Sequence, residues 1–114
     1  MAGAVICHVA DPVGTLGALA RLADQCVIIA FEDVIDSDDL VMRAANDWSN
    51  PIYDYTWWLL SRGLYRRVFA NMGFEVEFRP CVALHNPTGY NGLGAPRELA
   101  KTTIVAVRER GAPA

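Results

Sequence analysis

The sequence predicts a single α/β domain in which parallel strands come first and an antiparallel hairpin comes last. Residues 4–9 and 26–31 are short apolar runs on either side of an amphipathic segment, residues 12–24. The second run is continuously apolar, which is typical of a strand buried on both faces, as in a parallel sheet. Residues 74–79 alternate strictly between apolar and polar, and residues 102–107 form a last apolar run. We expect these two strands to pair across the long loop between them.

The first helix has a clear start. Asp11 is a good N-cap, because its carboxylate accepts from free backbone N–H groups, and Pro12 suits the first helical position. Apolar residues then recur at helical spacing up to Ala23. A strand, a helix and a second strand within about 30 residues predict a βαβ unit.

The middle of the chain predicts two further helices. A short helix over residues 37–45 is expected to be capped by Ser37. Ser61 is expected to cap a second helix that ends near Met72, and Gly73 is well placed to stop that helix in a left-handed conformation. Residues 85–99, between the last two strands, are rich in Gly, Asn and Pro and predict a loop.

Composition excludes several classes of function. The 114 residues leave room for one domain, residues 1–114, and the formal net charge of -3 argues against a general nucleic-acid binder. No apolar run is long enough to span a membrane, and the start of the chain lacks the basic residues of a signal peptide. The arginines of the only local basic cluster are expected on a solvated surface. They are Arg62, Arg66 and Arg67.

The three cysteines fit neither a CxxC pair nor a zinc pattern. We therefore expect reduced, buried thiols at Cys7, Cys26 and Cys81, and a cytoplasmic location. Clustered carboxylates over residues 36–39 lack the spacing and the turning glycine of a calcium loop, so we interpret them as a solvated acidic loop and predict no metal site.

Several segments resemble a known family. Residues 6–12, Ile-Cys-His-Val-Ala-Asp-Pro, resemble the Leu-Tyr-His-x-x-Asp-Pro signature at the fourth strand of certain class I S-adenosylmethionine-dependent methyltransferases. Residues 26–32 resemble the fifth strand, which ends at an acidic residue. Residues 57–61, Trp-Trp-Leu-Leu-Ser, precede a helix that ends in Met-Gly-Phe, and this too is similar to the family. The relatives in question are similar to enzymes that modify the wobble uridine of tRNA by carboxymethyl transfer.

The resemblance covers roughly residues 4–108 and implies half of a Rossmann-like methyltransferase sheet, with strands equivalent to the fourth to seventh. Two departures stand out: Cys7 replaces the tyrosine of relatives, and Leu60 replaces a frequent proline. The sequence also lacks the glycine-rich turn and the acidic ribose ligand of a nucleotide-binding half. Its single Gly-x-Gly, at residues 92–94, follows no clear strand, so we interpret it as a loop.

The resemblance implies S-adenosylmethionine as the cofactor of intact relatives, with a small molecule or tRNA as substrate. It suggests Cys7 and His8 for cofactor binding, because ligands bind at the carboxyl ends of strands in such sheets. Glu32 has a similar position and is a candidate for substrate binding. Trp57 and Trp58 are also candidates, although neighbours in an extended segment cannot both face the core.

Three hypotheses remain open, and no catalytic residue follows from the sequence. The first is a truncated or degenerate methyltransferase that is inactive alone and binds no cofactor tightly. The second is a non-enzymatic α/β module that dimerises or binds a partner through an exposed sheet edge. The third is a reading frame that begins at an internal position of a longer gene.

Overall fold

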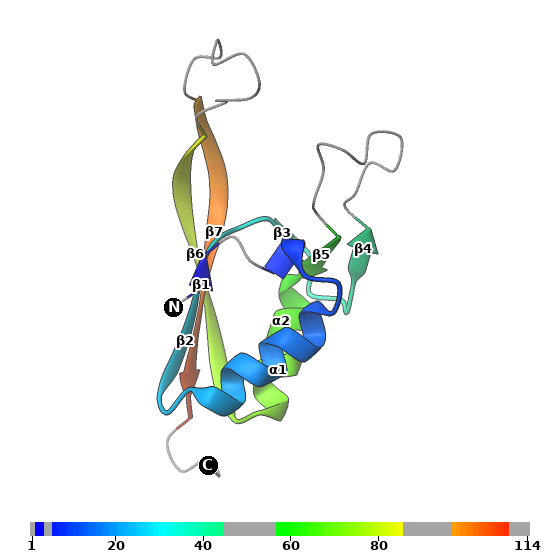
Figure 1. Ribbon diagram of the computed structural model, residues 1–114, viewed down its shortest axis with the longest axis vertical. Helices are drawn as coiled ribbons and strands as arrows, with labels where there is room; N and C mark the ends of the chain where they lie inside the picture. The colour runs from blue at the N-terminus through cyan, green and yellow to red at the C-terminus, as the bar shows by residue number, and fades with distance from the viewer. Residues whose placement is uncertain (1, 4–5, 45–56, 86–96, 110–114) are drawn as a thin grey trace.

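The computed structural model describes residues 2–3, 6–44, 57–85 and 97–109, which adopt an α/β fold (Figure 1). The main sheet has four strands in the order β1-β2-β7-β6. Its three longer strands pair with one another in antiparallel orientation, and the two-residue β1 pairs with β2 in parallel. The strands are β1 (Ala2–Gly3), β2 (Cys26–Glu32), β6 (Phe74–His85) and β7 (Arg97–Arg108).

The C-terminal hairpin is confirmed and is longer than predicted. β6 and β7 each have 12 residues and pair in one unbroken antiparallel register, from Phe74 opposite Arg108 to His85 opposite Arg97. The predicted alternation of β6 also holds, because Phe74 is buried while Glu75 and Glu77 are exposed. The glycine-rich loop of residues 86–96 lies outside the described residues.

Both main helices begin where local capping chemistry predicts. In α1 (Pro12–Leu22), the Asp11 side chain accepts a hydrogen bond from the Gly14 amide, and proline occupies the first turn. In α2 (Arg62–Asn71), the Ser61 hydroxyl accepts from the Leu64 amide. Gly73 follows α2 with φ of 83°, the left-handed conformation predicted for it.

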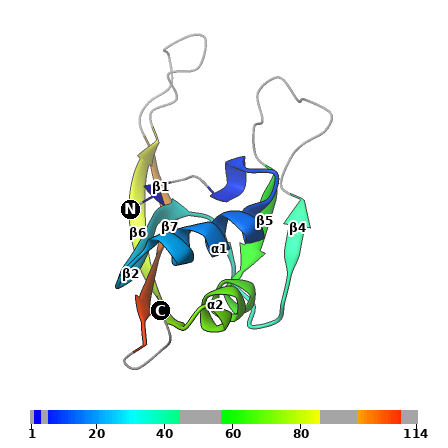
Figure 2. The ribbon, with the colours of Figure 1, turned by 60° about the horizontal axis from the view of Figure 1, so that its bottom comes forward.

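The two helices lie on the same face of the main sheet (Figures 1 and 2). Burial of apolar surface between these helices and the sheet is the main source of stability for a domain of this kind. Most of the core residues come from both helices and three strands of this sheet. They include Leu16, Ala20, Tyr65, Phe69, Ile29, Phe74, Ile104 and Ala106.

A second, smaller sheet was not predicted. It has the order β3-β5-β4, with β3 (Val34–Ile35) parallel to β5 (Trp58–Ser61), and β4 (Met42–Ala44) antiparallel to it. The predicted helix over residues 37–45 is therefore wrong, since its described part holds a bend and a strand. Ser37 instead accepts a hydrogen bond from the Asp39 amide within the bend.

The N-terminal strand also differs from the prediction. Residues 6–8, expected inside a strand over residues 4–9, form a 3-10 turn, η1 (Ile6–His8). The βαβ unit is present, but its parallel pairing is limited to Ala2 with Ile29 and Gly3 with Ala30. The described residues thus show an α/β fold without an extended parallel sheet.

Two expectations of burial were also wrong. The continuous apolar run in β2 predicted burial on both faces, yet Phe31 is 45% exposed. Cys26, expected to be a buried thiol, is exposed, while Cys7 and Cys81 are partly buried. All three cysteines are free thiols.

Candidate functional site

The candidate site lies at the carboxyl end of β2, where the strand is irregular. The register between β2 and β7 shifts between Ile29 and Glu32, and Phe31 has φ of 61°. Such a bulge adds one residue to a strand and reverses the alternation of its side chains. As a result Phe31 turns outward, and Glu32 turns into the protein, where it is 1% exposed.

Glu32 connects this strand end to the N-terminal turn. Its Oε1 atom accepts a hydrogen bond of 3.0 Å from the backbone amide of Ile6, the first residue of η1. A carboxylate that accepts from a buried N–H forms one of the stronger hydrogen bonds in proteins. Glu32 therefore holds the turn that carries Cys7 and His8 against the end of β2.

Cys7, the middle residue of this turn, joins it to the residue that precedes β5 of the smaller sheet. Its carbonyl oxygen accepts a hydrogen bond of 2.6 Å from the Trp57 amide. Burial raises the pKa of the Cys7 thiol from 9.0 to about 11, and the charges of Glu32 and Asp33 add to this shift. The thiolate is the reactive form of cysteine, so Cys7 is a poor nucleophile at neutral pH.

Tyr65 of α2 is a second protonated group of the site. Its side chain is 1% exposed, and burial raises the pKa of its hydroxyl far above the ordinary value. The negative charge of Glu32 raises the pKa of Tyr65 further, after the larger effect of burial. The site therefore holds a thiol and a phenol in their neutral forms next to a buried glutamate.

Only some of the site residues that the sequence suggested lie together in the structure. Cys7, Glu32 and Trp57 belong to one connected cluster, in which Trp57 is 39% exposed. His8 is exposed on the 3-10 turn rather than at a strand end, because β1 stops at Gly3. Trp58 packs against the hydrophobic core, which confirms that the two tryptophans do not both face inward.

Sequence reasoning missed an ion pair beside this cluster. Lys101 Nζ on β7 lies 2.8 Å from Oδ2 of Asp33, the residue that follows the buried Glu32. The positive charge of Lys101 lowers the pKa of Cys7, opposing the larger effect of burial. The two partners are 68 positions apart, so no local pattern indicates the pair.

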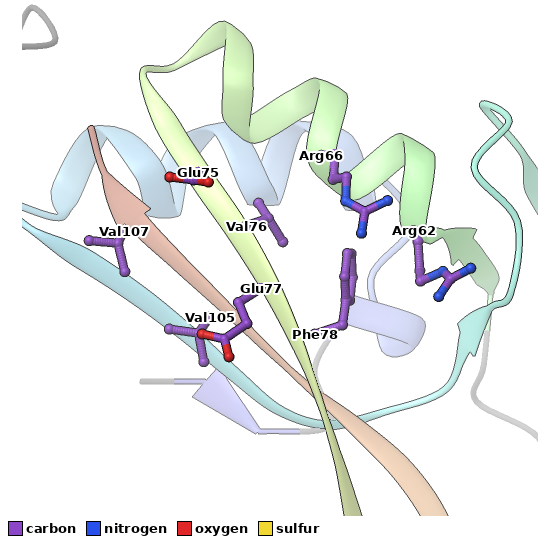
Figure 3. A pocket seen from close by; sticks show the side chains of 8 residues that line it. All are labelled: Arg62, Arg66, Glu75, Val76, Glu77, Phe78, Val105 and Val107. Carbon is purple, nitrogen blue, oxygen red and sulfur yellow. The ribbon is translucent and has the colours of Figure 1, made fainter. Parts of the chain in front are cut away.

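A separate groove lies along α2 and the free edge of β6, with a volume of about 590 Å³ (Figure 3). Val76 and Phe78 point toward Arg62 and Arg66, and Glu77 lies on the other side of the strand. A neighbouring hollow of about 340 Å³ shares Arg62 and Phe78 with it. Neither hollow is lined by a residue of the Glu32 cluster.

The arginines of this groove lie on the surface, as expected, and they pair with exposed aspartates of the acidic segment. Arg62 forms an ion pair with Asp36, and Arg66 Nη1 lies 2.9 Å from Asp38 Oδ1. The Arg66 guanidinium also lies 5.1 Å from the centre of the Phe78 ring, a cation–π distance. Since nearby aspartates offset both positive charges, the groove does not favour a phosphate group.

The described residues do not form a complete site for S-adenosylmethionine. Glu32 is almost inaccessible and already accepts the Ile6 amide, so its carboxylate is a structural group and not an open ligand position. The Gly-x-Gly of residues 92–94 lies outside the described residues. We therefore assign no step of a transfer reaction to a cofactor bound by this chain.

No family model matches the chain, and no curated protein is significantly similar to it. Within the described ranges, no three His, Cys, Asp or Glu side chains are grouped so that they could hold a metal ion. The helices of the described part are also too short and too polar to cross a membrane.

Proposed function

We propose that this chain is the C-terminal half of a methyltransferase-type domain. In this proposal it positions the methyl acceptor, and a separate cofactor-binding half supplies most of the site for S-adenosylmethionine. The observation that carries the proposal is the arrangement at the end of β2, where buried Glu32 holds the turn with Cys7 and His8. Ligands of open α/β sheets bind at the carboxyl ends of the strands, which is where this turn lies.

The order of elements supports the proposal. A short parallel pair, β1 and β2, is joined through α1, and an antiparallel hairpin closes the sheet. This is the order that the resemblance to the fourth to seventh methyltransferase strands implies. Methyl transfer depends mainly on positioning donor and acceptor, and it needs little covalent chemistry from the protein. The neutral thiol and phenol near Glu32 are consistent with such a role, since they leave no strong nucleophile beside the acceptor.

The proposal is tested by titrating the ¹⁵N-labelled chain with S-adenosylhomocysteine while recording amide chemical shifts. We expect weak binding, about millimolar in dissociation constant. We also expect shifts at Ile6, Cys7 and His8, and none in the groove beside Phe78. His8 is exposed, and we expect His8→Ala to reduce these shifts while the chain keeps its melting temperature.

Two outcomes contradict the proposal in different ways. Shifts confined to the Phe78 groove, or no shifts at all, show that the end of β2 is not a ligand site. Micromolar binding of S-adenosylmethionine by calorimetry, together with a raised melting temperature, shows that the chain needs no separate cofactor-binding half.

A further inference from the structure

One face of the main sheet carries apolar side chains that nothing in the described part of the chain covers. Both helices lie on the opposite face (Figures 1 and 2). Val27, Ile29, Ile104 and Ala106 are buried and face the helices, so the residues that alternate with them face outward. We call four of these the outer patch: Cys26, Ile28, Val105 and Val107.

The outer patch is continuous across two strands. Cys26 pairs with Val107, and Ile28 pairs with Val105, so the four side chains form two adjacent cross-strand pairs. Val107 is 49% exposed, and Cys26 is exposed as well. A strand with one face in water normally alternates between apolar and polar residues, whereas β2 is apolar on both faces. This pattern is typical of a sheet covered on both sides.

Acidic side chains border the patch on β6. Glu75 pairs with Val107 and Glu77 with Val105, so both carboxylates lie beside the two valines on the outward face. These two glutamates and two valines also line part of the 590 Å³ groove, which continues around the edge of β6 (Figure 3). The outer face therefore offers an apolar floor with a negatively charged border.

The free edge of β6 is a poorer docking site than this face. Pro80 lies within β6 and has no N–H to donate to an added strand. Charged residues at Glu75, Glu77 and Arg79 also disfavour strand addition along the same edge. A second copy of the chain is also a poor occupant of the outer patch. When two outer patches meet with their strands antiparallel, Glu75 and Glu77 of one copy lie beside those of the other, and the repulsion between these carboxylates opposes dimer formation.

We propose that the outer patch binds an amphipathic helix of a partner protein, with an apolar stripe flanked by Lys or Arg. A helix suits this position, because a helix can bury its apolar stripe against the face of a sheet, and α1 and α2 occupy only the other face. The apolar stripe packs on Val105, Val107 and Ile28. The basic flank lies over Glu75 and Glu77.

The test measures fluorescence anisotropy of a labelled peptide of about 18 residues, which makes five helical turns. The peptide has a leucine stripe flanked by lysines, and a second peptide has glutamates in place of the lysines. We expect the lysine peptide to bind about tenfold or more tightly than the glutamate peptide. Equal affinity of the two peptides overturns the proposal.

Paired variants locate the binding surface. Val107→Asp lies in the patch, and Val82→Asp adds the same charge at a valine of the same hairpin that is 58% exposed but outside the patch. We expect Val107→Asp to weaken binding of the lysine peptide about tenfold and Val82→Asp to leave it unchanged or slightly stronger. Equal effects of the two variants contradict the proposal.

A charge-reversal variant keeps the proposal testable if Val107→Asp fails to fold. Glu77→Lys changes an exposed side chain, and we expect it to weaken the lysine peptide and strengthen the glutamate peptide. Sedimentation of the chain alone provides the last check. A dimer that Val107→Asp dissociates shows that a second copy covers the patch, and this outcome also overturns the proposal.

Discussion

Glu32 is the side chain whose replacement most directly tests the candidate site. It is 1% exposed, and its Oε1 accepts a 3.0 Å hydrogen bond from the Ile6 amide. Glu32→Ala removes the acceptor and leaves a buried N–H and a small cavity, which together cost about 3 kcal/mol of unfolding free energy. Glu32→Gln keeps the shape and one acceptor oxygen but loses the charge, so its cost is smaller, about 1 kcal/mol.

The assay is urea denaturation followed by circular dichroism, with hydrogen exchange of the Ile6 amide as a local readout. In a domain of this size 1 kcal/mol shifts the melting temperature by about 4 °C, so Glu32→Ala is expected to lower it by about 12 °C. Exchange at Ile6 should accelerate more in this variant than at Ile104 of the core, because the local contact is lost as well.

Asp33→Asn provides a matched control. Asp33 is the neighbouring carboxylate, its side chain is 54% exposed, and it pairs with Lys101 across the surface. A surface ion pair contributes at most about 1 kcal/mol, so this variant should stay within that range of the wild type. The reasoning is refuted if Glu32→Ala costs no more than Asp33→Asn, or if Ile6 keeps its protection without the carboxylate.

Three further predictions concern backbone and thiol chemistry. Phe31→Gly should be about 1 kcal/mol more stable than Phe31→Ala in urea denaturation, because both lose the ring but only glycine relieves the positive φ of 61°; equal stability would show no strain. Gly63→Ala should lower stability by about 2 kcal/mol or more, since its Cβ would overlap the Asp38 carbonyl oxygen; an unchanged melting temperature contradicts that close approach. In single-cysteine variants at pH 8, exposed Cys26 should react with a disulfide reagent well before Cys7, and equal rates contradict this. Because the pKa of Cys7 is raised to about 11 in the folded protein, its contribution to stability is present below pH 9.0 and is lost as pH rises toward 11. A melting temperature that is flat over this range contradicts that expectation.

Features that depend on near neighbours in the sequence were predicted well. Asp11 caps α1 and Ser61 caps α2, because a short polar side chain reaches backbone amides three residues ahead. Gly73 takes a positive φ after α2 for an equally local reason, the absence of a Cβ. The alternation of β6 indicated a half-exposed strand, and the strand has that pattern.

The candidate site was found only in part, because its contacts join distant segments. Cys7, Glu32 and Trp57 were named from their positions beside predicted strands, and they do belong to one cluster. No local pattern indicates that Tyr65 approaches them from α2, or that Lys101 pairs with Asp33. The smaller sheet was missed because its three strands have only two to four residues, too few for a periodic signal.

The sequence by itself determined the starts of both helices, which depend on interactions within a few residues. It also indicated the α/β class and the C-terminal hairpin, because each strand and helix has its own local pattern of apolar residues. Only the tertiary structure decided which side chain at the end of β2 is buried. In a regular strand Phe31 would face the core with Ile29, and Glu32 would face outward. The bulge reverses this order, because the buried carboxylate gains the Ile6 amide as a partner while Phe31 stays 45% exposed.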